Sequence, residues 1–478
     1  MRGVTVLKPH PDRALPADPA VRALAREILA ATRDLPLLCM HGHVEASLLA
    51  DDLPFDDPAR LFVTPDHYLT RMLISQGVPM EALGIPGRDG GWVETDPRAI
   101  WRRFCEHWHV FRGTPTRFWL EYELLEVLGV SGLPSAKTAD PLYDEIAARL
   151  AEPGFRPRAL FERFGIEVLA TTDPAISPLA EHARIRDDAW PGVVIPTFRP
   201  DSLLRLDAPG WREEVAALGE MTGVDTGSYA GFLDALRARR AAFAKAGALA
   251  TDHGHATADT TPLPEAEAAR LYADALAGRP YGADAFAGHM LHVMAGMSAE
   301  DGLVMQLHPG VLRDHDPAVR AAYGPDRGFD IPIAAEFTRS LRPLLESYGR
   351  HPGLTLVVYT VDETTYSREL APLAGVYPAL RLGAPWWYLD TPDGLRRYRE
   401  AVTDTAGFYN TTGFVDDTRA FLSIPARHDL ARRADAGHLA RLVAEHRLGL
   451  DEAIETAVDL AYTLPKRTFT RSRPAGGQ

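Results

Sequence analysis

Short apolar segments recur along the chain, and most are followed by polar residues and then by a stretch with helical periodicity. An apolar run this short is typical of a strand buried on both faces of a parallel sheet. The segments that predict strands are residues 35–40, 166–172, 193–198, 247–251, 303–307, 354–360, 380–383 and 409–415. Eight strands that alternate with helices predict an α/β fold, a (β/α)8 TIM-like barrel, with a doubly wound open sheet as the alternative.

Helical periodicity fills the segments between these strands. It predicts helices at about 18–33, 68–76, 97–111, 116–128, 141–150, 264–277, 335–348, 392–403, 427–447 and 451–462. The helices after the first strand are too many for one strand-to-helix connection, so we expect a helical insertion at about 44–160. We therefore predict a lead-in and helix at 1–34 and a barrel over 35–478, with closing helices at about 427–465.

The composition narrows the class of protein and its partners. Of the 478 residues, 46% are hydrophobic and 24% are charged, and the net charge is −14. No basic block is present to bind nucleic acid, and no apolar run could span a membrane or serve as a signal peptide. The two cysteines, Cys39 and Cys105, fit a reducing compartment. We therefore expect a cytoplasmic protein without nucleic-acid or membrane partners, in which Cys39 is a buried structural thiol.

Two histidines, His41 and His43, follow the first predicted strand. Because side chains alternate along a strand, both would point the same way and could share one metal ion. Of two further His-x-His motifs, residues 107–109 lie in a predicted helix, where such side chains diverge. The other, residues 253–255, follows a strand and is a real rival. From the residues alone, two packed histidines explain 41–43 as well as a metal site does.

Polar residues follow most of the predicted strands. They are His41 and His43, residues 171–173, Arg199, Asp252 and His253, His308, Thr360 and Asp362, Trp386 and Trp387, and Asp416 and Asp417. In a barrel these side chains would meet at one mouth. Two imidazoles from the first strand and one aspartate from the last would form a single metal site with open positions. Spacing leaves the choice between Asp416 and Asp417 open.

The chain resembles the uronate isomerase (glucuronate isomerase) family of the amidohydrolase superfamily in seven motifs that occur in the family's order. They are His41-Gly42-His43, Asp66-His67-Tyr68 and residues 197–201, 251–254, 306–310, 383–390 and 416–419. The resemblance implies an aldose–ketose isomerase, an intramolecular oxidoreductase. Its substrates would be hexuronates: D-glucuronate, converted to D-fructuronate, and D-galacturonate, converted to D-tagaturonate. A homo-oligomer is also implied.

The same resemblance assigns the chemistry at the metal. It implies that His41, His43 and Asp417 hold one divalent ion, most simply Zn²⁺, since Asp417 fits the family's Asp-x-Arg pattern. Tyr68 and Asp417 would form the proton-transfer pair, and His67 would assist ring opening or oxygen protonation. A free tyrosine titrates near pH 10, so Tyr68 would need a lowered pKa to act as a base.

Five further residues are expected at the substrate. Arg199 and Arg419 would hold the uronate carboxylate as a bidentate clamp. His308, Trp386 and Trp387 would contact the sugar. From the residues alone, simpler explanations stand beside these roles: salt bridges for the arginines and core packing for the tryptophans. In the same way, the motif at residues 66–68 could be a helix cap.

Two other functions remain open from the sequence. Most of the superfamily hydrolyses amides or esters, so a metal-dependent hydrolase of a sugar-acid lactone or cyclic amide is the alternative. A non-catalytic sugar-acid binder is more distant. The fourth strand has no lysine that could bridge two metals, and the Asp66-His67-Tyr68 motif matches the isomerases. Both observations favour isomerisation.

Overall fold

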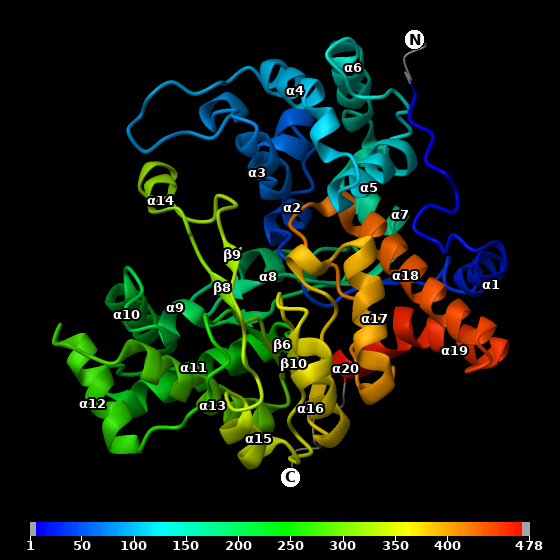
Figure 1. Cartoon of the computed structure of the whole chain (residues 1–478). Coiled ribbons are helices and arrows are strands. Elements are labelled where there is room, and N and C mark those ends of the chain that lie inside the picture. The colour runs from blue at the N-terminus through cyan, green and yellow to red at the C-terminus, as the bar shows by residue number, and fades with distance from the viewer. Residues whose placement is uncertain (1–5, 471–478) are drawn as a thin grey trace.

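The computed structural model describes residues 6–470 as an α/β protein in which parallel strands alternate with helices (Figure 1). One parallel sheet contains β1 (Leu37–Cys39), β2 (Ile166–Ala170) and β4 (Val194–Ile195). The second contains, in spatial order, β11 (Leu380–Leu382), β10 (Leu356–Val358), β7 (Val304–Leu307), β6 (Ala250–His253), β5 (Phe198–Arg199) and β3 (Asp173–Pro174). A short antiparallel hairpin joins β8 (Val311–Leu312) to β9 (Ile331–Pro332).

Backbone hydrogen bonds link these sheets to each other and to the segment that follows β11. Between β2 and β3, the N–H of Thr171 still donates to β4, at 2.9 Å. Beyond β11, Leu382 and Thr411 form a parallel bridge. The N–H of Asp417 then donates to the carbonyl of His41 at 3.1 Å. The residues that follow β1 therefore lie beside the last extended segment of the chain.

Successive residues of the strands pack in different parts of the core. Leu38 and Met40, at β1, pack in one cluster with Val357 and Tyr359, at β10. Their neighbours along both strands pack instead against the surrounding helices. Burial on both faces explains why these segments are apolar throughout, since a parallel sheet is covered by helices on each side.

Between β1 and β2 the chain forms a group of helices, part of which gathers at the top of Figure 1. These are α2 (Ala46–Asp51), α3 (His67–Ser75), α4 (Pro97–Glu106), α5 (Pro115–Tyr122), α6 (Ala139–Leu150) and α7 (Pro157–Arg163).

Short 3₁₀ or π helices occur along the described chain. They are Ala59–Val63, Glu81–Leu83, Trp108–Phe111, Glu123–Val127, Pro153–Phe155, Tyr366–Leu370, Trp387–Leu389, Phe421–Ser423 and Asp459–Thr463.

The later strands alternate with a second set of helices. These are α8 (Ala180–Asp187), α9 (Asp201–Leu204), α10 (Trp211–Thr222), α11 (Tyr229–Lys245), α12 (Glu265–Leu276), α13 (Ala283–Asp301), α14 (Pro317–Tyr323), α15 (Arg342–Tyr348), α16 (Ala371–Val376) and α17 (Pro392–Ala406). The last helices within residues 6–470 are α18 (Ile424–Ala444), α19 (Leu450–Val458) and α20 (Leu464–Phe469). Helix α1 (Pro19–Ala30) packs against α18 and α19. Within residues 6–470, no helix is long and apolar enough to cross a membrane.

Most predicted strands and helices are confirmed, but two segments differ. Residues 409–415, predicted as a strand, form only the bridge at Thr411, because Gly413 adopts a φ of +75° that interrupts the extended backbone. The helix predicted at 335–348 begins at Arg342. Pro343 lies in its first turn, where proline is tolerated, whereas the interior of a longer helix would be disrupted there.

Candidate active site

A cleft of about 1280 Å³ opens where the strands end. Most of the predicted site residues line it: His43, His67, Tyr68, Arg199, Trp386, Trp387, Asp417 and Arg419. The other two, His41 and His308, are 1% and 4% exposed, and their rings stack with centroids 4.6 Å apart. The structure thus brings together residues from both ends of the chain.

His41 and His43 both face the carboxylate of Asp417. Nε2 of His43 lies 3.1 Å from Oδ1 of Asp417, and Nε2 of His41 lies 3.5 Å from the same oxygen. Alternation along a strand is not the reason, because β1 ends at Cys39 and both histidines lie in the loop after it. Asp417 itself has a φ of +36°, a left-handed conformation that non-glycine residues adopt at a cost and that is concentrated at functional sites.

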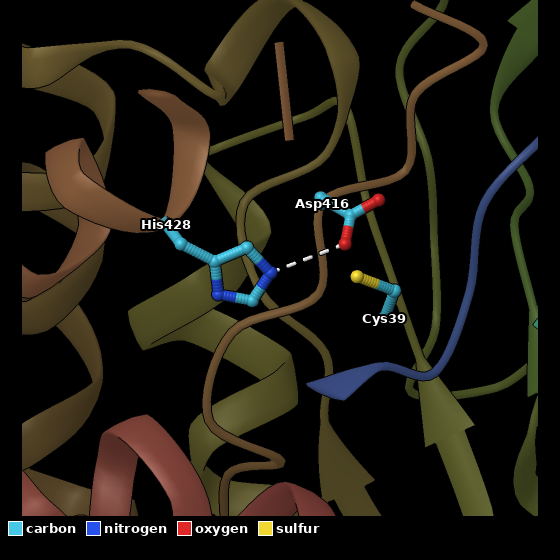
Figure 2. A group of neighbouring side chains, drawn as sticks. All are labelled: Cys39, Asp416 and His428. Atoms are coloured by element: carbon cyan, nitrogen blue, oxygen red, sulfur yellow. Dashed lines mark hydrogen bonds and ion pairs between the residues drawn. The ribbon is translucent and has the colours of Figure 1, made fainter. Parts of the chain in front are cut away.

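The two neighbouring aspartates point to different partners. Figure 2 shows Asp416 facing His428 of α18 and Cys39 of β1, with its Oδ2 3.1 Å from Nε2 of His428. Asp416 is 2% exposed, so this group is sealed off from the cleft that Asp417 lines. Cys39 is a buried free thiol whose pKa is raised by burial, as a structural cysteine would be. The geometry separates Asp416 from Asp417, which spacing alone could not do.

The protonation states of this group suit a metal ion. Burial lowers the pKa of His41 to about 4, so its imidazole is neutral at pH 7, the form that binds metal. Burial raises the pKa of Asp417, but His41 and His43 outweigh it, and the pKa lies below its usual range. Nδ1 of His41 and Oδ1 of Asp417 are buried without a well-formed hydrogen bond to any described residue. Two imidazoles and one carboxylate fit a divalent ion of the zinc type.

A chain of contacts leads from His41 to Arg199. His308, stacked on His41, lies with its Nδ1 2.7 Å from Oδ1 of Asp252. The other oxygen of Asp252 lies 3.3 Å from Arg199, whose Nε also donates to Asp201 at 2.9 Å. Burial lowers the pKa of Arg199, but these two carboxylates raise it above its ordinary value. The sequence identifies Asp252 only as a residue at the end of a predicted strand. Its position between the imidazole of His308 and the guanidinium of Arg199 depends on long-range packing.

Asp66 caps α3 and thereby places His67 and Tyr68 at the cleft. Its Oδ1 accepts a hydrogen bond from the N–H of Tyr68 at 2.7 Å, so the helix cap is present and is compatible with a position at the cleft. Burial lowers the pKa of His67 to about 3. Burial also raises the pKa of Tyr68, a shift that Arg427 reduces and Asp417 increases. The phenol is therefore protonated at pH 7, unlike the tyrosine base considered from the sequence.

Arg419 and the β8–β9 hairpin form another wall of the cleft. Arg419 contacts Asp326 at 3.0 Å, so it makes a salt bridge, the simpler of the two explanations, and still lines the cleft. Arg313 donates to Asp330 at 2.8 Å and lies 5.4 Å from the ring centroid of Trp387. Arg313, Asp326 and Asp330 were not predicted, because they belong to an irregular connection with no hydrophobic periodicity.

Comparison with known proteins identifies the family. A family model described as glucuronate isomerase matches residues 21–469. The chain belongs to the glucuronate isomerase family. A protein of Rhizobium meliloti (strain 1021) named uronate isomerase is 55% identical over 471 residues, 98% of this chain and 100% of that one.

Solved structures of isomerases share this fold. The crystal structure of glucuronate isomerase from Caulobacter crescentus matches with a TM-score of 0.95 at 48% identity, covering 99% of each chain. The uronate isomerase from Thermotoga maritima matches with a TM-score of 0.90 at 27% identity, covering 97% of this chain and 100% of that one.

Each of the seven glucuronate isomerase motifs found in the sequence supplies a side chain to the cleft or to the buried layer beside it. In chain order these are His43, His67, Arg199, Asp252, His308, Trp386 and Asp417. The rival motif His253-Gly254-His255 contributes only the flanking Asp252, and its two histidines do not line the cleft.

Proposed function

We propose that the cleft catalyses the aldose–ketose isomerisation of hexuronates, converting D-glucuronate to D-fructuronate and D-galacturonate to D-tagaturonate. The observation that carries this proposal is the convergence of seven separate family motifs on one cleft and the buried layer beside it. Relatives at 50–55% identity bear the name uronate isomerase. Neither these names nor the convergence of the motifs favours the hydrolase alternative.

The proposed uronate clamp consists of Arg199 and Arg419. Both line the cleft, and each guanidinium is oriented by acidic side chains, so their N–H groups are fixed before substrate arrives. His308 keeps a buried Nε2 without a hydrogen-bond partner among the described residues, which suits contact with a substrate oxygen. Trp386 and Trp387 are each 8% exposed and would form the apolar wall beside the sugar.

For the proton transfer we propose Asp417 and Tyr68 as the pair. Isomerisation removes the proton from C2, passes through an enediolate and returns a proton at C1, while a hydrogen moves between the two oxygens. Asp417 is charged and can accept a proton, and Tyr68 is neutral and can donate one. Neutral His67 would assist ring opening or oxygen protonation. A divalent ion, Zn²⁺ by its donor set, would be held by His41, His43 and Asp417 and would stabilise negative charge on the substrate oxygens.

The reaction is tested by proton NMR of the purified protein with D-glucuronate, and separately with D-galacturonate, in D₂O. We expect new ketose signals and deuterium at the exchanging carbon, since the transferred proton passes through an acidic side chain that exchanges with solvent. Silence with both sugars, in protein that contains at least about one equivalent of divalent metal, would contradict the proposal.

We further propose that the parallel strands close into a (β/α)8 barrel. The Leu382–Thr411 bridge and the bond from Asp417 to His41 support closure between the last and first strands. Helices α2–α7 would then form the insertion at about 44–160, after a lead-in at 1–34, with α18–α20 as closing helices. The cytoplasmic location and the homo-oligomer stay predictions.

A further inference from the structure

The motif His253-Gly254-His255, at the end of β6, has no role in the cleft. His253 is 0% exposed and His255 is 6% exposed. Asp201, the first residue of α9, lies beside them, and one ligand atom from each of the three residues lies within 4.8 Å of the other two. This cluster shares no residue with the group around Asp417.

Each member of the cluster carries a buried polar atom without a hydrogen-bond partner among residues 6–470. These atoms are Oδ1 of Asp201, Nδ1 of His253 and Nε2 of His255. Such atoms are rare in folded proteins, and three in one cluster call for an explanation. Nε2 of His255 lies 3.9 Å from Oδ1 of Asp201, too far for a hydrogen bond. An ion with bonds of about 2.0–2.1 Å to each atom would span that distance.

In two of these side chains, Asp201 and His253, the second polar atom already has a hydrogen-bond partner. Oδ2 of Asp201 accepts hydrogen bonds from the N–H of Gly254 and from Nε of Arg199, both at 2.9 Å. Nε2 of His253 lies 3.1 Å from Oγ1 of Thr251. An oxygen partner on the second ring nitrogen is what orients metal-binding histidines. Asp201 and His253 are thus held in place, each with one potential ligand atom free.

We propose that Asp201, His253 and His255 form a second metal site, for a divalent transition ion such as Zn²⁺. Two imidazoles and one carboxylate suit zinc and its neighbours, whereas magnesium and calcium prefer oxygen ligands alone. Burial of the ligands makes the site structural. Since one oxygen of Asp201 binds Arg199 and the other would bind the ion, Asp201 acts as a positioning residue for that arginine.

The test counts bound metal and does not depend on activity. Chelator-treated protein is titrated with Zn²⁺ alone, desalted and analysed by mass spectrometry for zinc. We expect about two equivalents in the wild type, about one in His255→Gln, about one in His41→Gln and none in the double variant. His438→Gln is the matched control, because His438 is 4% exposed with both ring nitrogens unpartnered, and it should keep both equivalents.

Circular dichroism establishes that each variant is folded, and Asp201→Asn tests the same site if His255→Gln fails to fold. Two equivalents retained in both Asp201→Asn and His255→Gln would overturn the proposal. So would a single wild-type equivalent that is lost in His41→Gln. A single equivalent that survives in His41→Gln and is lost in His255→Gln would support this site and contradict the metal at Asp417.

Discussion

Two His-Gly-His motifs follow parallel strands in this protein, and their surroundings differ. In the first, the side chain of His43 is 32% exposed and lines the cleft. In the second, His253 and His255 are almost completely buried. The first pair meets Asp417 at the cleft, and the second meets Asp201, which holds Arg199. On the proposed assignments, the same three-residue sequence serves catalysis in one place and structure in the other, and the two sites differ in access from solvent.

The largest loss of turnover is expected from substitutions of the cleft residues near the first motif. Tyr68→Phe should lower kcat by about 10²–10⁴-fold, because a proton-transfer group is lost while metal and fold are kept. Steady-state kinetics and metal analysis measure both quantities. Tyr229→Phe, a buried tyrosine bonded to His289 outside the cleft, is the control and should keep its turnover. A near-normal kcat in Tyr68→Phe would remove this tyrosine from the mechanism.

The two motifs can be compared directly by the same substitution. His41→Gln should lower kcat by at least about 10²–10³-fold, the loss expected when stabilisation of a developing oxyanion is removed. His253→Gln should stay within about tenfold of the wild type, since it acts only through the position of Arg199. Equal losses in kcat would show that the second motif also takes part in the chemistry.

Arg199 lines the cleft and also binds Asp201 of the proposed second metal site, whereas Arg419 only lines the cleft. Lysine at either position should raise KM for uronates by about tenfold to a hundredfold, because a point charge replaces a bidentate fork. Arg237→Lys, a half-exposed arginine on α11, is the control and should leave KM unchanged. Unchanged KM in both Arg199→Lys and Arg419→Lys would contradict the carboxylate clamp.

Both motifs should affect the pH dependence of the free energy of unfolding in the same direction. Burial lowers the pKa of His41 to about 4 and that of His253 to about 3, from an ordinary 6.5. Between pH 6.5 and these values the unfolded chain binds more protons than the folded one. The free energy of unfolding of metal-free protein should therefore fall as pH falls, by up to about 1.4 kcal/mol per pH unit for each histidine.

Urea unfolding of chelator-treated protein at several pH values measures this slope. His41→Asn and His253→Asn should each flatten it, and His109→Asn, which is exposed in the helical His-x-His motif, should not. A slope that does not change in His253→Asn would mean that this histidine does not stay neutral in the fold.

The central glycines should show the smallest effect. A Cβ at Gly254 would lie 2.7 Å from Nη2 of Arg199, whereas a Cβ at Gly42 would lie 3.3 Å from Oδ1 of Asp416. Gly254→Ala must displace the arginine and should raise KM about twofold to tenfold, with kcat nearly unchanged. Gly42→Ala should change KM less. The opposite order would indicate that the first loop is the more tightly packed of the two.

The strands and the residues at their ends could be predicted because both depend on local pattern. A short apolar run followed by a polar residue marks the end of a buried strand. Together with the expected barrel, this pattern placed Arg199 and His308 near one another. The helix predicted at 97–111 is interrupted at the His-x-His motif, because α4 ends at Glu106 and a 3₁₀ turn begins at Trp108. That His107 and His109 do not share an ion stays a prediction.

What could not be predicted depends on single backbone angles and on distant partners. The positive φ of Asp417 turns its carboxylate toward the histidines, and spacing contains no information on that angle. Asp252 acquires its role from His308 and Arg199, which other strands supply. The protonated state of Tyr68 follows from burial in the assembled cleft, which no local pattern reveals.

Helix α18 carries two adjacent residues that support both halves of the proposed proton-transfer pair. Arg427 lies 5.3 Å from the ring centroid of Tyr68, and His428 binds Asp416, the neighbour of Asp417. Helix α1 packs along α18, whereas the β8–β9 hairpin lines the cleft and leaves residues such as Leu312 48% exposed. Variant libraries for new sugar acids should therefore diversify the hairpin and keep the α1–α18 interface constant, so that selectivity can change without displacing the proposed proton-transfer pair.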